Sequence, residues 1–153
     1  MSGSDATASE AMSLLRTHWG IEGTLTRLPG ENINFLVDSP GTRRVLKITT
    51  DQESCPGLEE AVLERLHQAG FPVPGSFPTR SGDHVLQTDF ESLPARIRLQ
   101  SFLTGRQWRE VGAGSSLLSD LGRTLARIHA ALDDLVDTHP EAGRTHRWDL
   151  ARV

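Results

Sequence analysis

The pattern of hydrophobic and polar residues changes its period several times along the 153-residue chain, and each change marks a predicted element. Apolar residues recur at helical spacing over residues 8–19, 58–69 and 115–135, and a glycine follows each of the first two segments. Other runs are extended, apolar and rich in β-branched residues, which predicts strands. The predicted strands are residues 23–28, 34–38, 43–50, 85–90 and 95–103.

Turn-forming residues separate these strands. Pro29-Gly30 and Ser39-Pro40-Gly41 divide the first three strands, and residues 92–94 lie between the last two. Short connections favour antiparallel pairing of consecutive strands. The predicted fold class is therefore α+β: a five-stranded antiparallel sheet with a helix between strands three and four, then a break and one long helix.

The patterns divide the chain into three parts. Residues 1–10, rich in Ser, Ala and Thr, are expected to be a disordered lead-in, residues 11–103 a sheet domain, and residues 104–153 the start of a helical part. The long helix of that part has a wide apolar stripe, made of Leu117, Leu118, Leu121, Leu125, Ile128 and Leu132. Such a helix does not stand alone in water. It either packs on the sheet, pairs with a second copy of the chain, or belongs to a domain that this sequence does not complete.

The composition argues against several classes of function. A net charge of −4 and a pI near 5.8, with arginines scattered among acids, give no basic surface for nucleic acid. No apolar run approaches the roughly 20 residues needed to cross a bilayer, so no membrane partner is expected. The single cysteine, Cys55, cannot form an internal disulfide, and the six histidines lack paired metal-ligand spacing. A cytoplasmic protein without a metal site in this chain is expected.

Lys47 is the only lysine in the chain, although lysine and arginine together number 16. It lies near the end of an apolar run in which alternation places Lys47 and Val45 on one face of a strand, and Leu46 and Ile48 on the other. A compact ammonium suits a point contact with a phosphate or a carboxylate, whereas arginine suits planar, bidentate pairing. Lys47 is either an edge residue in solvent or the neighbour of an anion.

The helix predicted over residues 58–69 offers a carboxylate partner. Its acids are Glu59, Glu60 and Glu64. Helical periodicity places Glu59 beside the apolar stripe, whereas Glu60 aligns with Glu64 and His67 on the polar face. We therefore expect Glu59 to hold the Lys47 ammonium, which could then reach the phosphates of a nucleotide.

Five segments, in order, carry a family resemblance: residues 28–37, 45–48, 59–74, 98–105 and 121–129. They include the sequences LPGENINFLV, VLKI and RLQSFLTG. In these segments the chain resembles the aminoglycoside phosphotransferase and choline kinase-like superfamily, small-molecule kinases related to protein kinases, and most closely its hydroxylysine kinase-like group. The resemblance implies that residues 11–103 are a nucleotide-binding N-terminal lobe, and that residues 104–153 hold the hinge exit and the start of a truncated C-terminal lobe.

The resemblance also implies roles for particular residues. Lys47 would contact phosphate and Glu59 would be its helix partner. The turn with Gly30 and Asn32, together with Asn34, would cover the nucleotide; an ordinary hairpin turn and a polar strand-edge residue are the alternatives. The hinge would bind the purine through backbone groups, and its residues are Gln100, Ser101, Phe102 and Leu103. Otherwise this segment is simply the last strand of a sheet.

The catalytic loop of such kinases, His-x-Asp-x-x-x-x-Asn, and the later metal-binding Asp do not occur in this chain. Residues 81–84 have the wrong order, and residues 146–150 have the wrong spacing. No catalytic or metal-binding residue is therefore assigned. The chain is expected to be an inactive fragment that requires no cofactor by itself. Its full-length parent would use ATP or GTP with Mg²⁺ to phosphorylate a hydroxyl of an amino alcohol or amino sugar, and the acceptor would bind only with the missing lobe.

A second hypothesis of a different class stays open. The chain would then be a non-catalytic binding or oligomerisation module that self-associates through the helix at residues 115–135, and it could form the front domain of an aminotransferase-fused protein. Nucleotide binding separates the two hypotheses, because an exposed apolar helix favours association under both.

Overall fold

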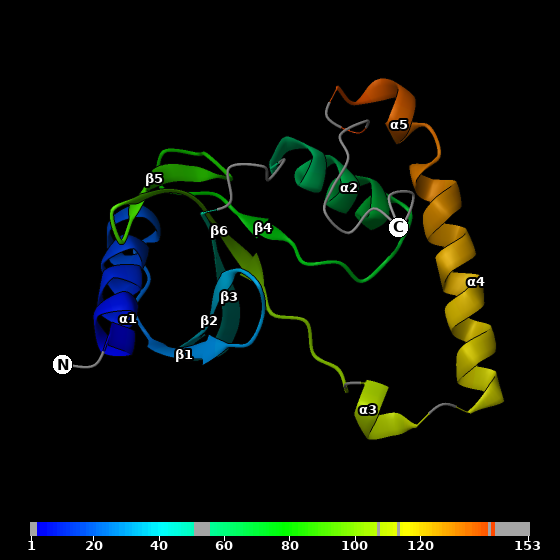
Figure 1. Ribbon diagram of the computed structural model, residues 1–153, viewed down its shortest axis with the longest axis horizontal. Helices are drawn as coiled ribbons and strands as arrows, with labels where there is room; N and C mark the ends of the chain where they lie inside the picture. The colour runs from blue at the N-terminus through cyan, green and yellow to red at the C-terminus, as the bar shows by residue number, and fades with distance from the viewer. Residues whose placement is uncertain (1–2, 51–55, 107, 113, 141, 143–153) are drawn as a thin grey trace. The chain divides into compact units, whose positions relative to one another are not determined.

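The strands and helices follow the predicted alternation closely. The computed structural model describes residues 3–50, 56–106, 108–112, 114–140 and 142 (Figure 1). These residues fall into two compact units, one within Met1–Ser54 and Pro74–Leu103, the other within Cys55–Val73 and Thr104–Val153. Among the described residues, no helix combines the length and the apolar character that a membrane crossing requires.

The first unit is an antiparallel sheet. Its strands are β1 (Thr24–Leu28), β2 (Ile33–Ser39), β3 (Thr42–Thr49), β4 (Ser76–Phe77), β5 (Leu86–Phe90) and β6 (Leu93–Ser101). The strand order is β1-β2-β3-β6-β4, and β5 also pairs with β6. The predicted α+β class is confirmed, and so is a helix in the chain after the third strand. The strand β4 was not predicted, because two residues are too short to display an alternation.

One face of this sheet carries the hydrophobic core. Alternate residues of β2, β3 and β6 are buried there: Phe35, Val37, Leu46, Ile48, Ile97 and Leu99. The helix α1 (Gly3–Leu14) and the π-helical turn η1 (Leu15–Trp19) cover the face with Ala11 and Leu15, both fully buried. Burying these side chains supplies the main driving force for folding of this unit.

The expected disordered lead-in at residues 1–10 is wrong for the described residues, because α1 begins at Gly3. Ala8 packs against the core, and it continues the spacing of Ala11 and Leu15 by three and seven residues. This segment was predicted to be disordered because most of its residues are polar, and its short apolar stripe was not taken into account. The backbone N–H of Glu91 also donates to the Glu10 carboxylate at 3.0 Å, which ties α1 to the β5–β6 turn.

That turn is tighter than expected. Glu91 and Ser92 have φ of +50° and +64°, and Phe90 pairs directly with Leu93, as in a two-residue hairpin of the primed type. The predicted turn at residues 92–94 is therefore shifted, and Pro94 lies inside β6 opposite Asp89. Its missing N–H is tolerated because it is the second residue of the strand, before β3 joins the ladder at Arg96.

The second unit is helical. Its helices are α2 (Pro56–Gln68), α3 (Trp108–Val111), α4 (Ser115–Leu132) and α5 (Leu135–Thr138). The helix α2 ends at Gln68, and the predicted stop residue Gly70 follows it with φ of +79°. The N–H of Phe71 donates to the Leu66 carbonyl at 3.0 Å, and the N–H of Gly70 donates to the His67 carbonyl at 2.9 Å, as in a Schellman cap.

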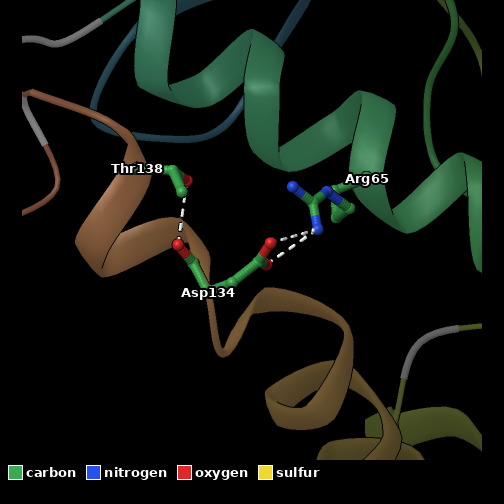
Figure 2. Close-up of polar contacts among 3 residues, drawn as sticks. All are labelled: Arg65, Asp134 and Thr138. Carbon is green, nitrogen blue, oxygen red and sulfur yellow. Dashed lines mark hydrogen bonds and ion pairs between the residues drawn. The ribbon is translucent and has the colours of Figure 1, made fainter.

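The long helix α4 packs against α2, a partner that the sequence analysis did not consider. The guanidinium of Arg127 lies over the Phe71 ring, 4.7 Å from its centroid. At the α4–α5 junction, one guanidinium nitrogen of Arg65 donates to both carboxylate oxygens of Asp134, at 2.7 and 3.0 Å (Figure 2). The Asp134 carbonyl also accepts the Thr138 hydroxyl at 2.8 Å.

Packing on α2 leaves much of the apolar stripe of α4 uncovered. Leu118, Leu121 and Leu125 are 51%, 42% and 46% exposed, and no described side chain of α4 is buried. The apolar stripe on this helix was therefore predicted correctly, but only part of it has a partner within the described chain.

Candidate functional site

The candidate site lies on the sheet face opposite the core. Asn34, Lys47 and Arg98 are register partners across β2, β3 and β6, so their side chains form one row, the Lys47 row. The next row towards the end of β6 contains Leu36, Val45, Gln100 and Ser76, and we name it the Gln100 row. The predicted alternation is confirmed, because Lys47 shares its face with Val45 while Leu46 and Ile48 are in the core.

Arg98 is a member of the Lys47 row that sequence reasoning missed. Lys47 is half-buried, whereas Arg98 is only 4% exposed. The missed signal was the alternation of β6, in which Ala95, Ile97 and Leu99 point into the core and leave Arg98 on the face of Lys47. Like charges directly opposite one another in a sheet repel, so a row with two cations is a candidate site for an anion.

The turn between β1 and β2 is braced by the residues that were predicted to cover a nucleotide. The side-chain amide of Asn34 donates to the Asn32 carbonyl at 3.3 Å. Arg27 donates to the carbonyls of Asn32 and Asn34 at 3.5 and 3.1 Å. Gly30 has φ of +147°, and a Cβ there would lie 3.0 Å from the Asn34 amide nitrogen. Asn34 therefore holds the shape of the turn, whatever else it contacts.

The hinge at Gln100–Leu103 is anchored through its first amides. The Ser101 N–H donates to the Gly75 carbonyl at 2.8 Å, and the Gly75 N–H donates back to the Ser101 hydroxyl at 2.9 Å. The Phe102 N–H donates to the Arg43 carbonyl at 3.4 Å, and the Arg43 guanidinium lies 4.6 Å from the Phe102 ring centroid. Leu103 follows and is 45% exposed.

Glu59 lies in the first turn of α2, in the second unit, whereas Lys47 belongs to the first unit. Glu59 and Glu60 are both half-buried, so burial does not choose between them. The pairing of Glu59 with Lys47 stays a prediction. Residues 146–150 and Cys55 lie outside the described residues.

A pocket of about 180 Å³ adjoins the Lys47 row on the side away from the hinge. It is lined by Thr49, Gln87, Thr88, Asp89, Pro94, Ala95 and Arg96. Thr49 and Arg96 pair with one another across β3 and β6. They lie one repeat of the pleat beyond the pair of Lys47 and Arg98. In the part of the chain that the structure describes, no three His, Cys, Asp or Glu side chains are grouped to hold a metal ion.

An antiparallel sheet, a helix inserted after its third strand and a following hinge and long helix define the N-terminal lobe architecture of kinase-like phosphotransferases. The chain belongs to the phosphotransferase enzyme family, whose family model matches residues 24–152.

Two curated relatives are hydroxylysine kinases. That of Bos taurus is 31% identical over 122 residues, which cover 71% of this chain and 32% of the relative. That of Mus musculus is 28% identical over 170 aligned positions, covering 96% of this chain and 44% of the relative. The chain thus spans 32% to 44% of the length of these relatives.

Solved structures agree on the fold. An amicoumacin kinase in complex with AMP-PNP and Ca²⁺ gives a TM-score of 0.71 at 19% identity, over 96% of this chain and 47% of that chain. A spectinomycin phosphotransferase in complex with ADP and spectinomycin gives a TM-score of 0.64 at 17% identity, over 81% of this chain and 38% of that chain. A microcompartment-associated aminopropanol kinase gives a TM-score of 0.63 at 23% identity, over 92% of this chain and 45% of that chain.

Proposed function

We propose that this chain is the nucleotide-binding lobe of a small-molecule kinase, and that the Lys47 row binds the phosphates of ATP or GTP. The observation that carries the proposal is the position of the only lysine beside Arg98 on the sheet face opposite the core. An ammonium and a guanidinium on one row suit the oxygens of a polyphosphate. Two structural neighbours, solved with ADP and AMP-PNP, support the proposal.

The hinge contacts follow from the same proposal. The amides of Ser101 and Phe102 donate within the protein, so the donor to the purine would be the N–H of Leu103. A carbonyl of Ser101 or Phe102 would accept from an exocyclic amine of the purine. Backbone contacts of this kind make the side chains of Ser101, Phe102 and Leu103 secondary.

The reaction of the whole protein would be transfer of the γ-phosphoryl group, with Mg²⁺, to a hydroxyl of an amino alcohol or amino sugar. The names of the hydroxylysine and aminopropanol kinases support an amino alcohol acceptor. The residues that orient an acceptor hydroxyl and bind metal in such kinases have no counterpart in this sequence, so transfer would need further polypeptide. The single cysteine and the use of ATP fit a cytoplasmic setting.

The direct test is nucleotide binding by the 153-residue chain, measured by calorimetry with ATP and Mg²⁺. Lys47→Met should weaken ATP binding by roughly 10-fold or more, since a hydrogen bond to a charged group contributes about 1.5–3 kcal/mol. Arg123→Met, which removes an exposed cation from α4, is the control and should bind as the unchanged chain does. Failure of the unchanged chain to bind any nucleotide would overturn the proposal.

A second candidate function rests on a separate observation, the exposed Leu118, Leu121 and Leu125 of α4. A continuous apolar stripe on a helix suits a non-catalytic binding or oligomerisation module, including self-association through residues 115–135. Association without nucleotide binding would favour this candidate over the first.

A further inference from the structure

An unsatisfied polar group lies in the Gln100 row. The Ser76 hydroxyl oxygen is buried and has no hydrogen-bond partner among the described residues. Ser76 is the register partner of Gln100, whose side chain is only 7% exposed. Buried polar groups in folded proteins almost always have a partner, so an orphaned hydroxyl beside an enclosed amide suggests a ligand or a water that bridges them.

The register places Ser76 and Gln100 in the row next to the Lys47 row. The Gln100 row is one pleat repeat, about 6.7 Å, from the Lys47 row. It also contains the first residue of the predicted hinge, Gln100. A nucleotide with its phosphates at Lys47 and its base at the hinge must pass over this row. Val45 and Leu36, in the same row, offer apolar surface to the flat face of the ring.

We propose that Ser76 and Gln100 recognise the N7 edge of a purine base, an inference that rests on the proposed nucleotide-binding function. The amide carbonyl oxygen of Gln100 can accept from N6 of adenine, and after the amide turns over its NH2 group can donate to O6 of guanine. The Ser76 hydroxyl donates to N7 in either case. Hinge contacts engage the opposite edge of the base, so the two sets of contacts do not compete. Pyrimidines have no N7 and are selected against.

Calorimetry with ATP, 7-deaza-ATP, CTP and inorganic tripolyphosphate tests this assignment. The unchanged chain should bind ATP roughly three- to tenfold more tightly than 7-deaza-ATP, the range for one hydrogen bond, and CTP more weakly still. Ser76→Ala and Gln100→Leu should each lower ATP affinity and reduce its advantage over 7-deaza-ATP. Neither variant should change the affinity for tripolyphosphate, which has no base.

The same variants also provide controls for effects on folding. Ser76→Ala removes an orphaned buried hydroxyl, so its unfolding midpoint without ligand should be unchanged or higher. Gln68→Leu, at an exposed position of α2, is the control for Gln100→Leu and should retain the preference for ATP.

Two failures are distinguishable. If the unchanged chain binds ATP and 7-deaza-ATP equally, or if both variants keep the full preference, the base-recognition role is wrong while nucleotide binding stands. If the unchanged chain binds neither ATP nor tripolyphosphate, the proposed function itself fails and this inference fails with it.

Discussion

Arg98 and Lys47 face one another across β3 and β6, and this pair of cations makes the clearest prediction for single residues. Replacing Arg98 by Met should weaken the binding of inorganic tripolyphosphate roughly 10-fold, because the row loses one of its two charges. Arg98→Lys keeps the charge but not the planar fork, so it should retain most of the affinity. The measurement is the rise in unfolding midpoint as tripolyphosphate is added.

The Arg98 experiment separates an anion-binding role from an internal one. If Arg98→Met responds to tripolyphosphate as the unchanged chain does, Arg98 serves only contacts within the protein. A lower midpoint in the absence of tripolyphosphate would then be its whole effect, since a buried charged side chain takes part in packing and hydrogen bonding whatever its ligand.

Gly30 carries the second residue-scale prediction. Its φ of +147° suits glycine alone, and an added Cβ would press on the Asn34 amide at 3.0 Å. Gly30→Ala should therefore lower the free energy of unfolding by about 1–3 kcal/mol and weaken nucleotide binding through the displaced turn. Chemical denaturation measures the first effect. Gly41→Ala is the matched control, because Gly41 also has positive φ but an added Cβ would meet no atom within 4 Å; an equal loss in both variants would mean that the contact with Asn34 adds nothing to the cost of the positive φ.

At the scale of elements, the contact between Arg65 and Asp134 joins α2 to the α4–α5 junction (Figure 2). The two side chains are 37% and 58% exposed, so solvent screens their attraction. A double-mutant cycle with Arg65→Met and Asp134→Asn should give a coupling of about 0.5–1 kcal/mol in the free energy of unfolding. The Asp120–Arg123 pair within α4, 65% and 67% exposed, should give less. Equal couplings would show that the Arg65 contact does not hold the helices together.

The helices and strands that sequence predicted best are those with long apolar patterns. The strands β2 and β3 were foreseen within a residue or two, because both are apolar runs bounded by turn residues. The start of α1 and the two-residue strand β4 were missed, since Ala8 and Ser76-Phe77 give too few apolar positions to mark a period. Those two elements are specified by tertiary packing rather than by local pattern.

At the scale of the whole molecule, local pattern predicts some residues of the site, and others depend on how distant segments pair. Alternation placed Lys47 and Val45 on their face correctly, because it needs only the strand itself. Alternation in β6 could have placed Arg98 on a face, but its position beside Lys47, and that of Ser76 beside Gln100, depend on the register of β6 against β3 and β4. Helical periodicity selected Glu59 as the partner of Lys47. Because the two residues belong to different units, this pairing stays a prediction.

The exposed stripe of α4 decides how the whole chain behaves in solution. Leu118, Leu121 and Leu125 are between 42% and 51% exposed on a helix whose described side chains include none that is buried. If they pair with a second copy of the chain, sedimentation velocity should show a dimer whose fraction grows with concentration.

Leu121→Gln should shift that equilibrium at least 10-fold towards monomer, because it places a polar amide where apolar surface would be buried on association. It should leave the unfolding midpoint of the monomer nearly unchanged, since Leu121 is already exposed. Arg123→Gln, two residues along the same helix, is the control and should dimerise like the unchanged chain. A chain that is monomeric at every concentration tested would contradict self-association, and it would leave the stripe as a surface for other polypeptide of the kinase-like fold.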